Sequence, residues 1–189
     1  LKYKNIIICS KSSRLQIDNP ESLILKNGNH LNVGWRGFDS RKKTYIRLKK
    51  GSKLNLENNV SFNSGCIIFV NFNGKLTIGE NTYLNEDTKL ICANEIFIGS
   101  NCAIAWSVSI IDEGGHDLIV NNNVKSKNSS IKIGDHVWIG LNSTILGGAN
   151  IGKNSILSAN SFIKSKIPSN SLNVKNDDTL IDSDEFDWK

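Results

Sequence analysis

"IKIGDHVWIGLNSTILGGANIGKNSILSANSFIKSKIPSNS", residues 131–171, carries a branched apolar residue at every sixth position. The positions are Ile133, Ile139, Ile145, Ile151, Leu157 and Ile163. An amphipathic helix repeats near 3.6 residues and a half-buried strand near 2, so a period of six indicates neither element alone. It indicates a short strand followed by a turn, with one apolar side chain per unit pointing inward. Three such units close a triangular coil, and coils stacked about 4.8 Å apart satisfy each other's backbone hydrogen bonds.

The same pattern extends upstream as whole coils, which place five apolar residues at equivalent positions: Leu56, Ile78, Ile98, Ile133 and Ile151. Their successive spacings are 22, 20, 35 and 18 residues. One spacing exceeds the 18-residue coil by 17 residues, and "DEGGHDLIVNNNVKSKNSS" (112–130) occupies it. We therefore expect one extended loop at about 112–130, an arm that leaves the solenoid and returns to it in register.

The length of 189 residues fits a single domain. We expect the solenoid to occupy residues 1–173, with less regular coils over residues 1–75, and a non-repeat acidic tail to occupy residues 174–189. A net charge of +5 without a recognisable DNA- or RNA-binding motif argues against a nucleic-acid partner. No apolar run approaches the roughly 20 residues of a membrane-spanning helix. The four cysteines lack metal-ligand spacing and a secretory context, so we interpret them as reduced thiols of a cytoplasmic protein.

Of the three histidines, His116 is the candidate for chemistry because it occupies no repeat position and follows two glycines on the arm. His136 falls at a coil corner where other coils carry asparagine, and His30 falls in a turn. The arm separates His116 from His136, and His30 lies several coils away. A zinc site needs imidazoles converging within about 2.1 Å of one ion, so we expect no metal.

The repeat, the "VWIG" motif (137–140) and the Gly-His arm together resemble the maltose/galactoside/Nod-factor type of hexapeptide-repeat O-acetyltransferases. The segment "YLNEDTKLICANEIFIGSNCAIAWSVSIIDEGGHDL" (83–118) resembles the part of these enzymes that carries the acceptor site and the catalytic histidine. The resemblance covers residues 75 to 171 and implies an all-β fold, a left-handed parallel β-helix. Periodicity alone leaves the hand open, since most parallel crossovers are right-handed.

The resemblance implies transfer of an acetyl group from acetyl-CoA to a sugar hydroxyl, with His116 as the general base. The second ring nitrogen would be held by Asp112, Glu113, Asp117 or a backbone carbonyl, and the sequence does not choose among them. Asn85 matches an acceptor-contacting asparagine. The residues matching the CoA site are Trp138, Gly140, Leu141, Ala159 and Lys164. The resemblance also implies a homotrimer with the cleft between neighbouring subunits.

Two departures from the family pattern bear on the substrates. The tail "SLNVKNDDTLIDSDEFDWK" (171–189) is acidic and lacks the usual "GNPA"-like turn and basic end, although Lys175 is available near the adenine end of CoA. The coils before residue 75 resemble those of capsular or surface-polysaccharide acetyltransferases, which favours a polysaccharide, oligosaccharide or sugar-nucleotide acceptor. For Trp35 and Trp106 two roles stay open, a sugar-stacking face or a core or subunit contact, and we favour the contact.

The sequence leaves two other functions open. The same base would serve N-acetylation of an amino-sugar nucleotide, because an amine acceptor also has to lose a proton. A non-catalytic solenoid, structural or ice-binding, would use the same repeat, but it has no need of the arm, and its ice-binding form would need ranks of outward threonine that are sparse here.

Overall fold

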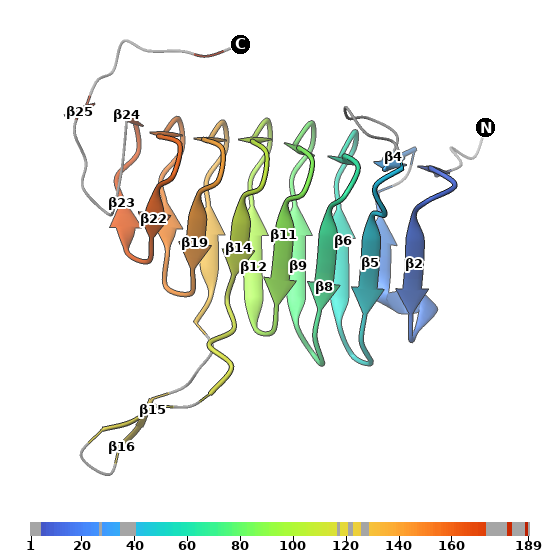
Figure 1. Ribbon diagram of the computed structural model, residues 1–189, viewed down its shortest axis with the longest axis horizontal. Coiled ribbons are helices and arrows are strands. Elements are labelled where there is room, and N and C mark those ends of the chain that lie inside the picture. The colour runs from blue at the N-terminus through green and yellow to red at the C-terminus, as the bar shows by residue number, and fades with distance from the viewer. Residues whose placement is uncertain are drawn as a thin grey trace.

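The computed structural model describes residues 5–26, 28–34, 41–116, 118–120, 123–125, 129–172, 181–182 and 188. Over this part of the chain the body is a left-handed parallel β-helix whose coils stack along one axis (Figure 1). Each complete coil contributes one strand to each of three seven-stranded sheets. The predicted fold is confirmed.

The three sheets run the length of the solenoid and are named A, B and C in the order in which the chain visits them. Sheet A contains β1 (Ile6–Cys9), β4 (His30–Val33), β7 (Ser61–Phe62), β10 (Tyr83–Leu84), β13 (Ala103–Ile104), β18 (Trp138–Ile139) and β21 (Ile156–Leu157). Sheet B contains β2 (Arg14–Ile17), β5 (Tyr45–Leu48), β8 (Ile67–Val70), β11 (Lys89–Cys92), β14 (Ser109–Ile111), β19 (Thr144–Leu146) and β22 (Phe162–Ile163). Sheet C contains β3 (Leu23–Leu25), β6 (Lys53–Leu56), β9 (Lys75–Ile78), β12 (Glu95–Ile98), β17 (Ile131–Ile133), β20 (Asn150–Ile151) and β23 (Lys166–Ile167).

The six-residue period places successive apolar residues in successive sheets. Ile133 lies in sheet C, Ile139 in sheet A and Ile145 in sheet B, and each side chain is fully buried. The predicted equivalent positions form one column of sheet C, in which Ile98 pairs with Ile78 on one side and with Ile133 on the other. These side chains are buried and in contact from coil to coil, so they form part of a continuous core. Burying each one contributes roughly 1.5–3 kcal/mol to the stability of the fold.

The corners between sheets C and A have left-handed backbone conformations. The backbone angle φ is 57° at Asn81, 56° at Asn101, 56° at His136 and 54° at Asn154. Asparagine tolerates this region better than other residues with a Cβ, which explains its recurrence. The Asn81 side-chain amide donates to Oδ1 of Asn101 at 3.2 Å, so the corner side chains also bond from coil to coil. The prediction that His136 occupies this corner is confirmed.

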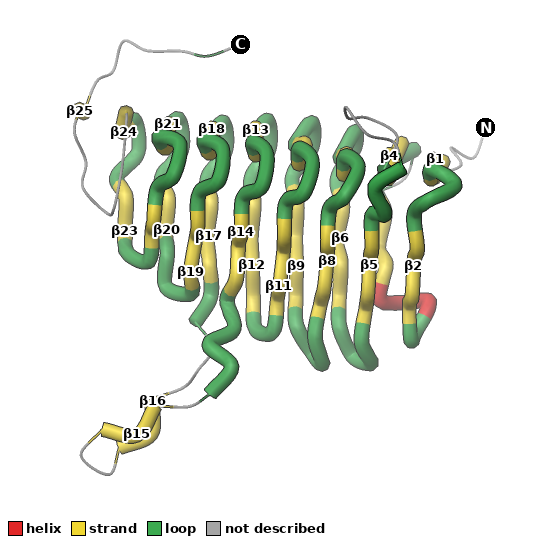
Figure 2. Tube along the Cα trace, in the orientation of Figure 1, coloured by secondary structure: helices red, strands yellow, loops and turns green. Residues whose placement is uncertain are grey.

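The arm begins where β14 ends and returns at β17. Because Ile98 pairs directly with Ile133, the arm is an insertion between two coils that remain in register. It carries an antiparallel hairpin of β15 (Leu118–Val120) and β16 (Asn123–Lys125), which extends away from the solenoid (Figure 2). The predicted loop is confirmed, and the hairpin within it was not predicted.

The remaining elements lie near the two ends of the chain. A 3-10 turn, η1 (Pro20–Ser22), precedes β3, and β24 (Ser171–Leu172) pairs antiparallel with β25 (Ile181–Asp182). Among the described residues, no helix has the length and apolar character needed to cross a bilayer.

Candidate active site

The outer face of sheet A is hollowed where one coil carries only small side chains. Ile104 points into the core, so its neighbours Ala103 and Ala105 point outward. Ala103 pairs with Tyr83 in the coil before it and with Trp138 in the coil after it. Two alanines between coils bearing large aromatic side chains leave a depression.

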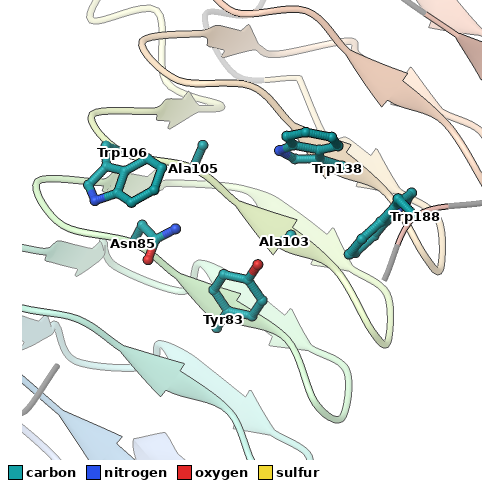
Figure 3. A pocket seen from close by; sticks show the side chains of 7 residues that line it. All are labelled: Tyr83, Asn85, Ala103, Ala105, Trp106, Trp138 and Trp188. Carbon is teal, nitrogen blue, oxygen red and sulfur yellow. The ribbon is translucent and has the colours of Figure 1, made fainter. Parts of the chain in front are cut away.

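Seven residues line this depression, which we call the aromatic pocket: Tyr83, Asn85, Ala103, Ala105, Trp106, Trp138 and Trp188. Its volume is about 210 Å³. The alanines form its floor, and Tyr83 and Trp138 lie on opposite sides of that floor (Figure 3). Trp106 lies at the corner leading from sheet A to sheet B, with 43% of its surface exposed. Trp106 is therefore a pocket residue rather than part of the core.

Asn85 is the amide of the aromatic pocket. Nδ2 of Asn63, one coil earlier, donates to Oδ1 of Asn85 at 2.8 Å. This bond orients the Asn85 amide, and its nitrogen points toward Ala105 (Figure 3). A ligand oxygen in the pocket would thus meet a fixed hydrogen-bond donor beside aromatic faces, which suits a sugar ring with its hydroxyl groups.

Of the predicted CoA residues, Trp138 lies in β18 and lines the aromatic pocket, and the other four divide between two corners of the solenoid. Gly140, Leu141 and Ala159 lie at the corner between sheets A and B, next to the aromatic pocket. A Cβ on Gly140 would lie 2.5 Å from the backbone nitrogen of Ala159, so the two coils approach too closely there for any side chain. Lys164 is exposed at the other end of β22, at the corner between sheets B and C. Sheet B separates it from the other predicted CoA residues.

His116 is exposed on the arm, away from the aromatic pocket of its own chain. The chain enters β14 from the sheet A side and enters the arm from the other end of that strand. The preceding Gly115 has φ +75°, and a Cβ there would meet no heavy atom within 4 Å. A single chain therefore does not bring the histidine and the pocket together.

Asp112 anchors the base of the arm and is 1% exposed. Its carboxylate accepts hydrogen bonds from the backbone amides of Ala93 at 2.6 Å and Asn94 at 3.0 Å. The thiol of Cys92 approaches it at 3.7 Å. Burial raises the pKa of Asp112, and the two backbone hydrogen bonds oppose that rise. Asp112 is one of the groups proposed to orient His116, but both of its carboxylate oxygens already accept backbone N–H groups of the β-helix. Asp117, another of these groups, lies outside the described residues.

The sequence did not point to Trp188 as a pocket residue. Its ring stacks on that of His136, with centroids 4.4 Å apart and planes 14° apart. It also lies 6.3 Å from the Trp138 ring, tilted by 50°. A tryptophan next to an acidic chain end was the visible signal, but nothing local indicated where it would dock. Trp35 and Lys175 lie outside the described residues.

The described part of the chain contains neither a cluster of metal ligands nor a buried thiol with a lowered pKa. No three His, Cys, Asp or Glu side chains there lie close enough together to hold a metal ion. Burial raises the pKa of Cys66 and Cys92 to about 12 and that of Cys102 to about 11, so these thiols stay protonated.

Comparison with known proteins gives matches to the repeat and to acetyltransferases. Residues 130–165 match the family described as the hexapeptide repeat of succinyl-transferase. Galactoside O-acetyltransferase of Escherichia coli (strain K12) is 32% identical over 106 residues, covering 54% of this chain and 51% of that protein. A Saccharomyces cerevisiae protein named as an acetyltransferase is 33% identical over 104 residues, covering 54% and 53% of the two chains. This chain thus spans about half the length of the curated relatives it matches.

A solved structure supports the fold over nearly the whole chain. The polysialic acid O-acetyltransferase OatWY superimposes on 98% of this chain and 91% of its own, with a TM-score of 0.62 and 20% identity. Strand topology, repeat and matches agree: residues 130–165 match the hexapeptide-repeat family, the described body has the fold of a left-handed parallel β-helix, and about half of the sequence is similar to acetyltransferases that include a galactoside O-acetyltransferase.

Proposed function

We propose that this protein is an acetyl-CoA-dependent O-acetyltransferase that acts on a hydroxyl group of a polysaccharide, oligosaccharide or sugar-nucleotide acceptor. The observation that carries the proposal is the aromatic pocket with its oriented Asn85 amide, next to a corner where Gly140 and Ala159 nearly touch. Aromatic faces bind the apolar side of a sugar ring, and the amide binds a hydroxyl. The close approach of Gly140 to Ala159 at the neighbouring corner leaves room for the narrow pantetheine arm of CoA.

The chemical step is a direct transfer. The acceptor oxygen attacks the thioester carbonyl carbon while Nε2 or Nδ1 of His116 removes its proton. The C–S bond then breaks, and the proton passes from the imidazole to the departing CoA thiolate. A base that titrates near neutral pH suits both proton transfers. The high pKa values of Cys92 and Cys102 argue against an acetyl-cysteine intermediate.

The catalytic centre is proposed to form between copies of the chain in a homotrimer. His116 and the aromatic pocket lie at different sides of one chain, so the pocket would receive the arm of a neighbour. Sheet B carries an outward apolar column in register beside the arm: Phe69, Ile91, Ile111 and Leu146. A contact between neighbours would bury this column and complete the centre.

The cytoplasm is the proposed location. All four cysteines are free thiols, and Cys9 is exposed. A reducing compartment preserves such thiols, and acetyl-CoA is available there.

The deciding experiment is mass spectrometry of a glycan panel incubated with protein and acetyl-CoA. An added acetyl group that hydroxylamine removes indicates an ester, and a resistant one indicates the amide expected of an N-acetyltransferase. His116→Ala should lower turnover by roughly 10²- to 10⁴-fold and leave the Kd of CoA unchanged. His30→Ala is the matched control, since His30 begins β4 of sheet A, not the turn that the sequence predicted, and lies near the far end of the solenoid. Turnover of His116→Ala within a few-fold of wild type would exclude the base assignment.

Light scattering tests the assembly. A trimer is expected, and mixing His116→Ala with Asn85→Ala subunits should restore activity because mixed trimers contain intact centres. A fully active monomer would contradict the shared centre.

A further inference from the structure

We infer that Trp188 is a specificity-determining residue that limits the acceptor pocket to a single sugar ring at a chain end. The inference rests on the proposed function of the aromatic pocket as the acceptor site. It assigns a role to Trp188, which lies outside the repeat and outside the matched residues 130–165.

Trp188 is held by reciprocal contacts with His136. The indole Nε1 donates to the backbone oxygen of His136 at 3.4 Å, and Nε2 of His136 lies 3.2 Å from the backbone oxygen of Trp188. The stacked rings add a third contact between the same two residues. Three contacts to one residue fix both the position and the orientation of the indole.

The corner that receives Trp188 is itself rigid. Nδ1 of His136 lies 3.3 Å from Oδ1 of Asn154, and the Asn154 amide donates to Oδ1 of Asn170 at 3.2 Å. The backbone amide of His136 bonds to the oxygen of Ser100 in the preceding coil. The platform therefore belongs to the coil ladder, so the docked tryptophan is a fixed wall of the pocket.

Trp188 narrows the pocket without filling it. One face of the indole is used by the His136 ring, which keeps the indole at the corner between sheets C and A. Trp106 bounds the opposite side, at the corner between sheets A and B (Figure 3). The remaining volume of about 210 Å³ is below the roughly 300–1,000 Å³ of pockets that hold drug-sized ligands.

A wall at each side of sheet A prevents an extended chain from crossing the pocket. An internal residue of a polymer has neighbours at two positions of its ring and would need both sides open. A terminal residue has one neighbour and fits a pocket open on one side. The geometry thus favours acetylation of terminal sugars.

The test compares wild type with Trp188→Ala and Trp188→Phe, using Phe72→Ala as a control that removes an exposed aromatic ring elsewhere. The probes are methyl glycosides of galactose, glucose, N-acetylglucosamine and N-acetylneuraminic acid, and linear trisaccharides of the same sugars. Binding is measured by saturation-transfer NMR, and tandem mass spectrometry locates the acetyl group in each trisaccharide. CoA binding is measured by calorimetry.

We expect wild type to bind at least one methyl glycoside and to acetylate only terminal residues. Trp188→Ala should weaken glycoside affinity by about tenfold and allow internal acetylation, while Trp188→Phe stays closer to wild type and the Kd of CoA is unchanged. If Trp188→Ala leaves the glycoside affinity and the position of the acetyl group unchanged, the inference is overturned. Tighter glycoside binding by Trp188→Ala would also overturn it, because Trp188 would then obstruct the pocket rather than bind the sugar. Failure of every probe to bind wild type would also overturn it. Absence of CoA binding by wild type would instead contradict the proposed function.

Discussion

The carboxylate of Asp112 accepts a hydrogen bond of 2.6 Å from the backbone amide of Ala93, and this contact ties the first residue of the arm to the coil before it. The backbone oxygen of Asp112 also accepts from the amide of Ser129, where the arm returns. One residue therefore fixes both ends of the excursion that carries His116.

Replacing Asp112 with asparagine should loosen the base of the arm. Both carboxylate oxygens accept backbone N–H groups, so the amide nitrogen of the substituted side chain would face a donor and leave it unpaired. We expect a lower Tm and a fall in kcat larger than the change in CoA affinity. Asp135→Asn is the control, because Asp135 also accepts a backbone amide, that of Ser100, at a corner away from the arm. Equal effects of the two variants on kcat would contradict the anchoring role.

The burial of Asp112 predicts a pH dependence of stability. Burial raises the pKa of Asp112 in the folded protein above its unfolded value. The contribution of the Asp112 carboxyl group to the free energy of unfolding is therefore fully present below its unfolded pKa and is lost as the pH rises through its folded pKa. The difference in unfolding free energy between wild type and Asp112→Asn should narrow from acidic to neutral pH. Chemical denaturation at several pH values measures it, and a widening difference would contradict the sign.

Thiol reactivity should separate Cys9 from the other three cysteines. Cys9 is exposed, whereas Cys66, Cys92 and Cys102 are buried with pKa values of about 12, 12 and 11. At pH 8 we expect one thiol per chain to react with Ellman's reagent under native conditions and four in denaturant. Activity should survive native modification, and its loss would point to a catalytic thiol.

Gly140→Ala should disturb the proposed CoA groove as well as the fold. The new Cβ would lie 2.5 Å from the Ala159 backbone nitrogen, so the coils must separate. Gly99→Ala is a matched control, because its Cβ would lie 2.6 Å from the Gly134 backbone at a different corner. Both variants should lose roughly 1–3 kcal/mol of unfolding free energy and therefore unfold at lower temperature. Calorimetry should find weaker CoA binding only in Gly140→Ala, and equal losses would remove the groove from that corner.

Asn85→Asp tests the donor in the aromatic pocket. An aspartate retains an oxygen to accept from Asn63 Nδ2, so the coil contact survives while the donor toward the pocket is lost. We expect the acceptor KM to rise and kcat/KM to fall by about 10- to 100-fold, with the KM of acetyl-CoA little changed. Asn81→Asp, at a corner outside the pocket, controls for the added charge. A wild-type acceptor KM in Asn85→Asp would remove Asn85 from the site.

The fold was predictable because each coil repeats the same local rule. Spacing alone assigned Ile133, Ile139 and Ile145 to different sheets, and a surplus of residues located the arm. The pocket wall was not predictable in this way. The contact between His136 and Trp188 joins residues 52 positions apart and depends on side-chain surfaces rather than on periodicity. The role of Asp112 was hidden for a related reason, because its partners are backbone amides, which every sequence contains.

Strand alternation in sheet A assigns stability and recognition to different side chains. Leu84, Ile104 and Ile139 face the interior, while their neighbours along the same strands line the aromatic pocket. Under the proposed function, substitutions at the outward positions would alter which sugar is accepted and leave the buried side chains that maintain the shape in place. In evolution such a scaffold can change its substrates one outward residue at a time, and a designer can do the same by grafting the outer residues of a single coil.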